Sequence, residues 1–321
     1  MTLMETAKEK WSGAVGTVVL GADAAAGGTR KSVVTLGGAS TLPFLKFDGQ
    51  TPHRPAVAME VWDSAPEDWP APLATALGDL VKSPVEWART CVEKFGADLI
   101  CLRLTSTHPD LANTSPQKAA ETVKAVLKAI SVPLIVWGCD QPDKDNQVLP
   151  VCSQAAAGER CLFGTVTEDN YKTLAVSCLA DGHCLIGLSP IDINIAKQVN
   201  VLVTEMGFPL DRLVMYQTTG ALGYGLEYTY SIQERGRLAA LGGDRLMAVP
   251  VICMVGQEAW RTREARATEE ELPGWGSEKE RGLNWEIATA AALLQAGSDI
   301  LVLRHPAAVA AIKTSIGQLM S

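Results

Sequence analysis

The sequence predicts an α/β fold: a (β/α)8 TIM barrel over residues 54–321, preceded by an N-terminal β-hairpin extension over residues 1–53. Short apolar runs recur from residue 54 onward, and each is almost continuously hydrophobic, as is typical of strands covered on both faces. Helical segments separate these runs, and strands that alternate with helices favour a parallel sheet. Eight such units over about 265 residues match the size of this barrel, and a doubly wound open sheet is the alternative.

The first element is the hairpin, within "GTVVLGADAAAGGTRKSVVTLGG" at residues 16–38. Two valine-rich runs flank a loop of small residues that contains Gly27 and Gly28. Two strand-like runs joined by a glycine-containing connection are typical of a β-hairpin.

The barrel strands are predicted from the apolar runs, which occupy residues 55–61, 97–104, 132–138, 160–166, 183–189, 211–217, 248–254 and 299–304. Ser-Pro pairs predict where three of the intervening helices begin, because serine caps a helix and proline suits its first turn. These pairs start at Ser83, Ser115 and Ser189. The longest connection follows the seventh strand, over residues 255–282, and is highly charged. Its length predicts a lid, a partner surface or an extra helical element.

The composition is that of a soluble globular protein, with 47% hydrophobic and 20% charged residues and a formal net charge of −8. The acidic balance argues against nucleic-acid binding, which needs clustered lysine and arginine. The sequence contains no apolar run long enough for a membrane span and no signal-peptide core near its start. We therefore expect a cytoplasmic protein.

The sequence has eight cysteines, and no two of them form a CxxC pair. Iron–sulfur clusters and structural zinc sites usually show tighter spacing than this. Most of the cysteines lie in apolar runs such as "ADLICLRL" and "VPVICMV", where cysteine behaves as a small buried hydrophobic residue. We expect reduced core thiols and no metal site in this chain.

Chemistry in a TIM barrel takes place at the carboxyl ends of the strands. The residues predicted to lie there are Glu60, Trp62, Asp63, Arg103, Thr105, Ser106, Trp137, Cys139, Asp140, Thr165, Thr167, Ser189, Gln217, Thr218, Thr219, Gln257, Arg304 and His305. The set contains no lysine, which argues against a Schiff-base enzyme. The chain's four histidines are scattered, which argues against a metal-dependent hydrolase, and His305 is either an acid/base group or a solvent-facing loop residue.

The acidic and aromatic side chains among these each have two interpretations. Glu60, Asp63 and Asp140 either contact a ligand or cap turns and helices. Arg103 and Arg304 either bind a ligand or form salt bridges with these acidic residues at the barrel rim. Trp62 and Trp137 either cover a flat ligand or pack beneath the loops.

The stretch "MYQTTGALGYGLEYTYSIQERGR", residues 215–237, is rich in glycine and hydroxyl groups and lacks a nucleophile or an acid/base pair. Its glycines follow a GxxGxG pattern, the reverse of the dinucleotide-binding fingerprint. Glycine permits a close backbone approach to a ligand, and a helix that begins near Leu226 would direct unpaired amides toward it. The alternative is a loop that only closes the sixth strand, with Tyr228 and Tyr230 packed inside.

The segment "TTGALGYGLEYTYSIQERGR", followed by "VPVICMVGQEAW", resembles the small subunit of the corrinoid iron–sulfur protein of the reductive acetyl-CoA (Wood–Ljungdahl) pathway. Archaeal members of this family are the delta subunit of the acetyl-CoA decarbonylase/synthase complex. "HRPAVAMEVWD", "ADLICLRLTSTHPD" and "VPLIVWGCDQPDKDNQVLP" also resemble the family, so the similarity covers essentially the whole chain.

The resemblance implies a cytoplasmic TIM barrel in a heterodimer with a large subunit. That subunit carries the four-iron four-sulfur cluster and most of the cobamide (a cobalamin-type corrinoid), and the barrel caps the corrinoid's other side. The cobalt accepts a methyl group from methyltetrahydrofolate, held by a separate methyltransferase, and passes it to acetyl-CoA synthase for carbon fixation. The hard chemistry then belongs to the cofactor, and this chain needs no catalytic side chain.

If the resemblance holds, our hypothesis is that the corrinoid is lined by Thr218, Thr219, Gly220, Gly223, Tyr224 and Gly225, with Thr105, Ser106, Trp137 and Asp140 from other loops. Two alternatives stay open. The barrel itself could bind methyltetrahydrofolate through Asp63 and Asp140, as pterin-binding methyltransferases of similar fold do with rim Asp and Asn. The chain could also be a purely structural subunit that contacts only protein.

Overall fold

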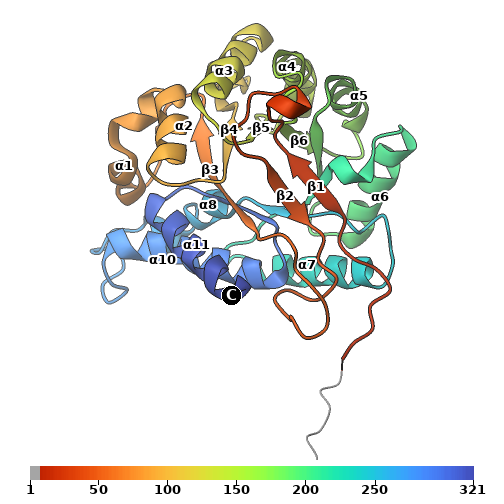
Figure 1. Ribbon diagram of the computed structural model, residues 1–321. Coiled ribbons are helices and arrows are strands. Elements are labelled where there is room, and N and C mark those ends of the chain that lie inside the picture. Colours follow the sequence, from red (N-terminus) through yellow and green to blue (C-terminus); the bar gives the residue numbers. More distant parts are fainter. Residues whose placement is uncertain (1–7) are drawn as a thin grey trace, which may run out of the picture.

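The computed structural model describes residues 8–321 and forms a nearly closed barrel of parallel strands (Figure 1). In the described chain the barrel strands are β3 (Ala56–Trp62), β4 (Leu99–Arg103), β5 (Leu134–Trp137), β6 (Leu162–Val166), β7 (Cys184–Leu188), β8 (Leu213–Tyr216), β9 (Ile252–Cys253) and β10 (Ile300–Leu303). Their order is β8-β7-β6-β5-β4-β3-β10-β9, with every pair parallel. The edges β8 and β9 meet at one bridge, between Met215 and Val251. The predicted barrel is confirmed.

Helices surround the barrel in the order that the alternating pattern predicts (Figure 1). They are α1 (Ala71–Leu77), α2 (Pro84–Glu93), α3 (Pro116–Ala129), α4 (Pro142–Ala155), α5 (Tyr171–Asp181), α6 (Ile193–Glu205), α7 (Leu226–Leu241), α8 (Val255–Ala259), α9 (Arg263–Arg266), α10 (Glu278–Ala296) and α11 (Pro306–Met320). Within residues 8–321, no helix is both long and apolar enough to cross a lipid bilayer.

Two of the three predicted helix starts are confirmed. The side chains of Ser83 and Ser115 accept hydrogen bonds from backbone amides in the first turns of α2 and α3. The start predicted at Ser189 is wrong, because α6 begins at Ile193 and is capped by Asp192. Ile191 has a φ of 44°, a left-handed conformation that no helix contains, so the helix starts only after this residue.

The predicted hairpin is also confirmed, as the antiparallel pair β1 (Thr17–Leu20) and β2 (Val34–Gly37). It lies across the near end of the barrel in Figure 1. Its side chains Val18, Leu20 and Leu36 are fully buried in the same cluster as the inward-facing strand residues. The hairpin therefore closes the amino-terminal end of the barrel, and any ligand of the barrel must approach the other end.

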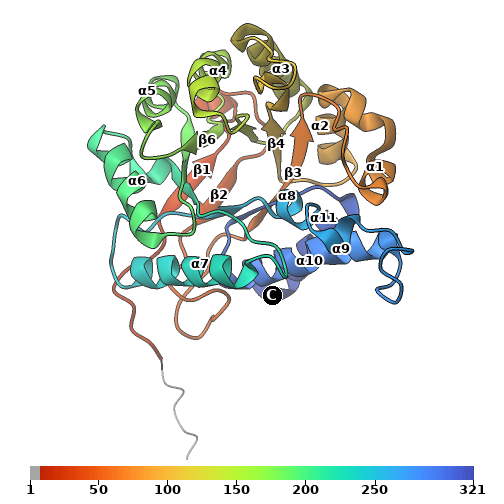
Figure 2. The same cartoon turned by 180° about the vertical axis from the view of Figure 1, so that it is seen from behind.

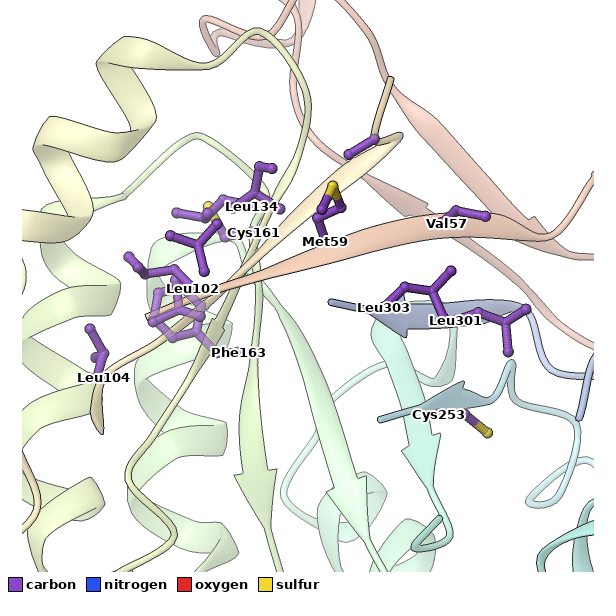
Figure 3. Close-up of a cluster of buried hydrophobic side chains, with 14 of the residues drawn as sticks. Val57, Met59, Leu102, Leu104, Leu134, Cys161, Phe163, Cys253, Leu301 and Leu303 are labelled. Carbon is purple, nitrogen blue, oxygen red and sulfur yellow. The ribbon is translucent and has the colours of Figure 1, made fainter. Parts of the chain in front are cut away.

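Two apolar layers alternate along the strands. Inward-facing residues such as Ala58 and Ile135 fill the barrel, and outward-facing residues such as Met59 and Phe163 pack beneath the helices (Figure 3). All of these side chains are fully buried, which explains why the strands read as continuous apolar runs.

Candidate functional site

The carboxyl ends of the strands lie opposite the hairpin, on the side seen in Figure 2, where α8 and α9 are in front. At the centre of this end, the fully buried Glu60 accepts two hydrogen bonds from Arg304, from Nε at 2.7 Å and from Nη2 at 2.9 Å. Arg103 lies 3.7 Å from Glu60 and also donates to Asp140 and Gln257. Burial opposes the charge on Glu60, but the two arginines outweigh it and hold the pKa of its carboxyl below the ordinary value. The barrel mouth is thus filled by paired charges, as the ion-pair interpretation of the arginines predicts.

Asp140 and Trp137, two of the predicted site residues, lie together beside this centre. The indole Nε1 of Trp137 donates to Asp140 Oδ1 at 2.9 Å. Trp137 is buried and packs edge-on against Tyr216, with ring centroids 5.1 Å apart, so its role in this chain is aromatic packing. Asp145 on α4 accepts the Asp140 amide at 3.1 Å and so fixes the loop that carries Asp140.

Thr105 and Ser106 form a second group around Asp63. The Asp63 carboxylate accepts from the Ser106 hydroxyl at 2.5 Å, from the Ser106 amide at 2.8 Å and from the Thr105 hydroxyl at 3.1 Å. Burial raises the pKa of Asp63, although these hydrogen bonds oppose it. Asp63 therefore serves as the acceptor that orders this loop.

The third group is the loop over residues 218–225. Thr218 has a φ of 62° and its hydroxyl donates to the Ser189 carbonyl at 2.9 Å, while the Thr219 hydroxyl accepts the Met254 amide at 3.0 Å. A Cβ added at Gly220 would overlap the backbone oxygen of Gly225, so this position requires glycine for a close approach within the loop itself.

The outer part of that loop faces solvent. Gly223 and Gly225 have positive φ angles of 76° and 89°, and the helix α7 begins directly after them, as predicted. Tyr224 is 50% exposed and Tyr228 is 63% exposed, so the alternative in which Tyr228 packs inside is wrong. The Tyr224 hydroxyl accepts the amide of Arg263 at 3.2 Å.

The structure therefore separates the predicted site residues into three neighbouring groups on one end of the barrel. It also reveals a buried carboxylate that the strand-end pattern missed. Glu286 on α10 accepts from the Arg304 amide at 2.6 Å and from Trp260 Nε1 at 2.8 Å, and burial raises its pKa to about 7. A lone glutamate among the apolar residues of "NWEIATAAALL" was the available signal. His305 stacks on Trp260 and caps α11 by accepting the Ala307 amide, so it is a half-buried cap.

Exposed apolar side chains surround this filled centre. On or beside the loops that follow the strands, the exposed large hydrophobic residues include Leu111, Ile191, Tyr224 and Tyr228. Among residues 8–321, no group of three His, Cys, Asp or Glu side chains is placed to hold a metal ion. The arrangement suits a surface that is covered by a large, flat partner, because its centre is already occupied by the chain's own side chains.

Comparison with known proteins gives a consistent set of relatives. Residues 17–314 match the family described as the CO dehydrogenase/acetyl-CoA synthase delta subunit. The chain is 40% identical over 319 residues to the acetyl-CoA decarbonylase/synthase complex subunit delta of Archaeoglobus fulgidus, covering 96% of this chain and 69% of the relative. The corresponding subunit of Methanopyrus kandleri is 36% identical, with 92% and 73% covered, and that of Methanocaldococcus jannaschii is 32% identical, with 98% and 76% covered.

Among solved structures, the fold is similar to that of dihydropteroate synthases. The enzyme of Xanthomonas albilineans in complex with 7,8-dihydropteroate gives a TM-score of 0.57 at 15% identity, covering 88% of this chain and 100% of that one. The enzyme of Thermus thermophilus gives 0.53 at 16% identity, with 87% and 98% covered. At this level of identity, the similarity concerns the fold.

Proposed function

The chain belongs to the family of the CO dehydrogenase/acetyl-CoA synthase delta subunit, and on this premise we propose that it is the small subunit of a heterodimeric corrinoid iron–sulfur methyl carrier in the cytoplasm. The carboxyl end of its barrel covers one face of a cobamide, and a large subunit holds the other face together with a four-iron four-sulfur cluster. The methyl group arrives from methyltetrahydrofolate through a methyltransferase and leaves to acetyl-CoA synthase.

The observation that carries this proposal is the combination of a filled centre and an exposed apolar rim. A corrin ring is broad and flat, so a protein covers it with a surface more readily than it encloses it in a narrow pocket. Tyr224 and Tyr228 offer exposed aromatic faces, and Gly223 lets the backbone lie close to a ring edge. The residues present therefore fit the cofactor as a cover, with the loop 218–225 as the principal contact.

When bound, the cobamide supplies the cobalt centre that carries the methyl group. The side chains of this chain exclude water from the cobalt, and their hydroxyl groups donate hydrogen bonds to acceptors within the chain. Ser106 donates to Asp63, and the Thr218 hydroxyl donates to a backbone carbonyl. This agrees with a subunit that has no acid or base of its own in the reaction.

The folate-binding alternative has less support. Asp63 and Asp140, the two acids it requires, are both engaged by neighbouring side chains of this chain. Glu60 and its arginines occupy the barrel mouth, where a pterin would have to enter. The similarity to dihydropteroate synthases concerns the fold and does not restore this site.

Co-expression with the large subunit tests the proposal. We expect a red heterodimer that contains cobalt, whereas a colourless active homodimer would contradict it. Tyr224→Ala should then alter the cobalt absorption spectrum of the heterodimer. Phe47→Ala is the matched control, because Phe47 is an equally exposed aromatic residue in the N-terminal extension. Unchanged spectra in both variants would favour the purely structural subunit.

A further inference from the structure

A second exposed feature lies beside the barrel, in the connection after β9. We call residues 268–280 the acidic knob, because this segment carries five glutamates and one lysine. Its central residue, Trp275, is 53% exposed and lies between Gly274 and Gly276, whose φ angles are 89° and 77°. The knob lies at the amino-terminal end of α10 and projects to the side of the barrel in Figure 2.

The knob is held in one conformation by hydrogen bonds at both ends. Glu271 accepts from the amide of Thr268 at 2.8 Å and from its hydroxyl at 3.2 Å, and the Trp275 amide donates to the Leu272 carbonyl at 3.2 Å. The buried Arg281 donates to the backbone carbonyls of Glu264 at 2.5 Å and of Ala267, which precede the knob, and to the carbonyl of Gly276 within it at 3.5 Å. The segment should therefore lose little conformational entropy when a partner binds Trp275.

Trp275 packs against a second tryptophan of the chain. Its ring centroid lies 6.3 Å from that of Trp285, whose indole donates to the Leu222 carbonyl and so anchors the pair to the barrel. About half of Trp275 (53%) is exposed to solvent. Tryptophan is, with tyrosine and arginine, enriched among the residues that contribute most of the binding energy at protein–protein interfaces.

We propose that the acidic knob is a docking element for a second protein, one that carries lysine and arginine side chains around an apolar cleft that receives Trp275. The charges decide the chemistry of this partner. Glu270 and Glu280 are exposed and make no side-chain hydrogen bond within the described chain, so they are available to cations. A corrinoid offers neutral amides and a phosphate, which leave these carboxylates unpaired, and nucleic acids and most membrane surfaces are anionic. A second copy of this chain, with a net charge of −8, would bring like charges together.

This inference concerns a different surface from the proposed corrinoid cover and rests only on the chain's membership of a multi-subunit complex. The test uses the co-expressed heterodimer and two purified proteins as probes, the methyltransferase and acetyl-CoA synthase. Calorimetry measures each dissociation constant at several salt concentrations. We expect Trp275→Ala to weaken the binding of one probe at least tenfold. The double variant Glu270→Lys, Glu280→Lys should weaken the same probe and remove most of the salt dependence of its affinity.

Matched controls are Phe47→Ala, an equally exposed aromatic residue elsewhere, and Glu121→Lys, an exposed charge on α3. Heterodimers with either control substitution should bind both probes like the parent heterodimer. Affinities that are the same for the knob variants and the controls would overturn the proposal. A loss of cobalt in Trp275→Ala with unchanged protein affinities would also overturn it, because Trp275 would then belong to the cofactor surface. A parent heterodimer without cobalt would contradict the proposed function instead, and the affinities would still decide the role of the knob.

Discussion

Glu286 shows how a single buried carboxylate joins elements that are distant in the sequence. It lies on α10, receives amide hydrogen bonds from the end of β10, and holds the indole of Trp260 from the connection after β9. The side chain of Arg304 turns away from it toward Glu60, so Glu286 has hydrogen bonds but no cation in direct contact. Burial without a paired cation is the reason that its pKa rises to about 7.

Glu286 makes the stability of the chain depend on pH. Its folded pKa of about 7 lies above the ordinary value of 4.5, so the contribution to the free energy of unfolding is fully present below pH 4.5 and is lost as the pH rises through 7. The loss amounts to about 3 kcal/mol. We expect Glu286→Gln to flatten this part of the profile, as measured by urea unfolding at pH 5.5 and pH 8.5. The same pH dependence in both proteins would show that another group is responsible.

Gly220 and Gly223 provide a matched pair in the candidate site. A Cβ at Gly220 would overlap the backbone of Gly225, whereas a Cβ at Gly223 would meet open space. Gly223→Ala should therefore cost only the strain of a positive φ, about 1–2 kcal/mol, and Gly220→Ala should cost more because the backbone must move. Thermal unfolding of the two variants checks this difference. Equal shifts would mean that the loop relaxes without resistance.

At the scale of elements, the sequence predicts the strands well and the site contacts poorly. Strands buried on both faces leave a continuous apolar run, and all eight runs contain barrel strands. β9 is much shorter than its predicted run, with only Ile252–Cys253 in the ladder. Contacts such as that between Trp285 and Leu222 join residues far apart in the chain, and no local pattern specifies them. The strand-end rule placed Thr105 and Ser106 on the correct end of the barrel but could not show that Asp63 holds them.

The hairpin β1–β2 should be an essential part of the barrel core. Leu20 is fully buried against the strand ends, so Leu20→Ala removes packed atoms and leaves a cavity. We expect a loss of about 2–5 kcal/mol in the free energy of unfolding. Val33→Ala, on an exposed residue beside β2, is the control and should change stability by less than about 0.5 kcal/mol. A small effect of Leu20→Ala would indicate that the barrel folds independently of its hairpin.

For the whole molecule, the cysteines make a simple test of packing. All eight are free and buried, and burial raises the pKa of Cys253 and Cys184 to about 11. Thiols in this state are poor nucleophiles at pH 8. The folded chain should therefore react with none of its thiols in a rapid assay with a disulfide reagent, and with all eight after denaturation. Fast reaction of one or more native thiols would show that part of the barrel opens readily.

The single bridge between β8 and β9 gives the barrel a weakest point. In the described chain one backbone hydrogen bond, from the Met215 amide to the Pro250 carbonyl at 2.8 Å, joins the two strands. The loop with Tyr224 follows β8, and the connection that leads to the acidic knob follows β9. A small separation of β8 from β9 would therefore move the loop with Tyr224 away from the connection that leads to the acidic knob. The hairpin would keep the opposite end of the barrel closed. Amide hydrogen exchange should reveal this hinge, with Met215 exchanging faster than the central strand amides.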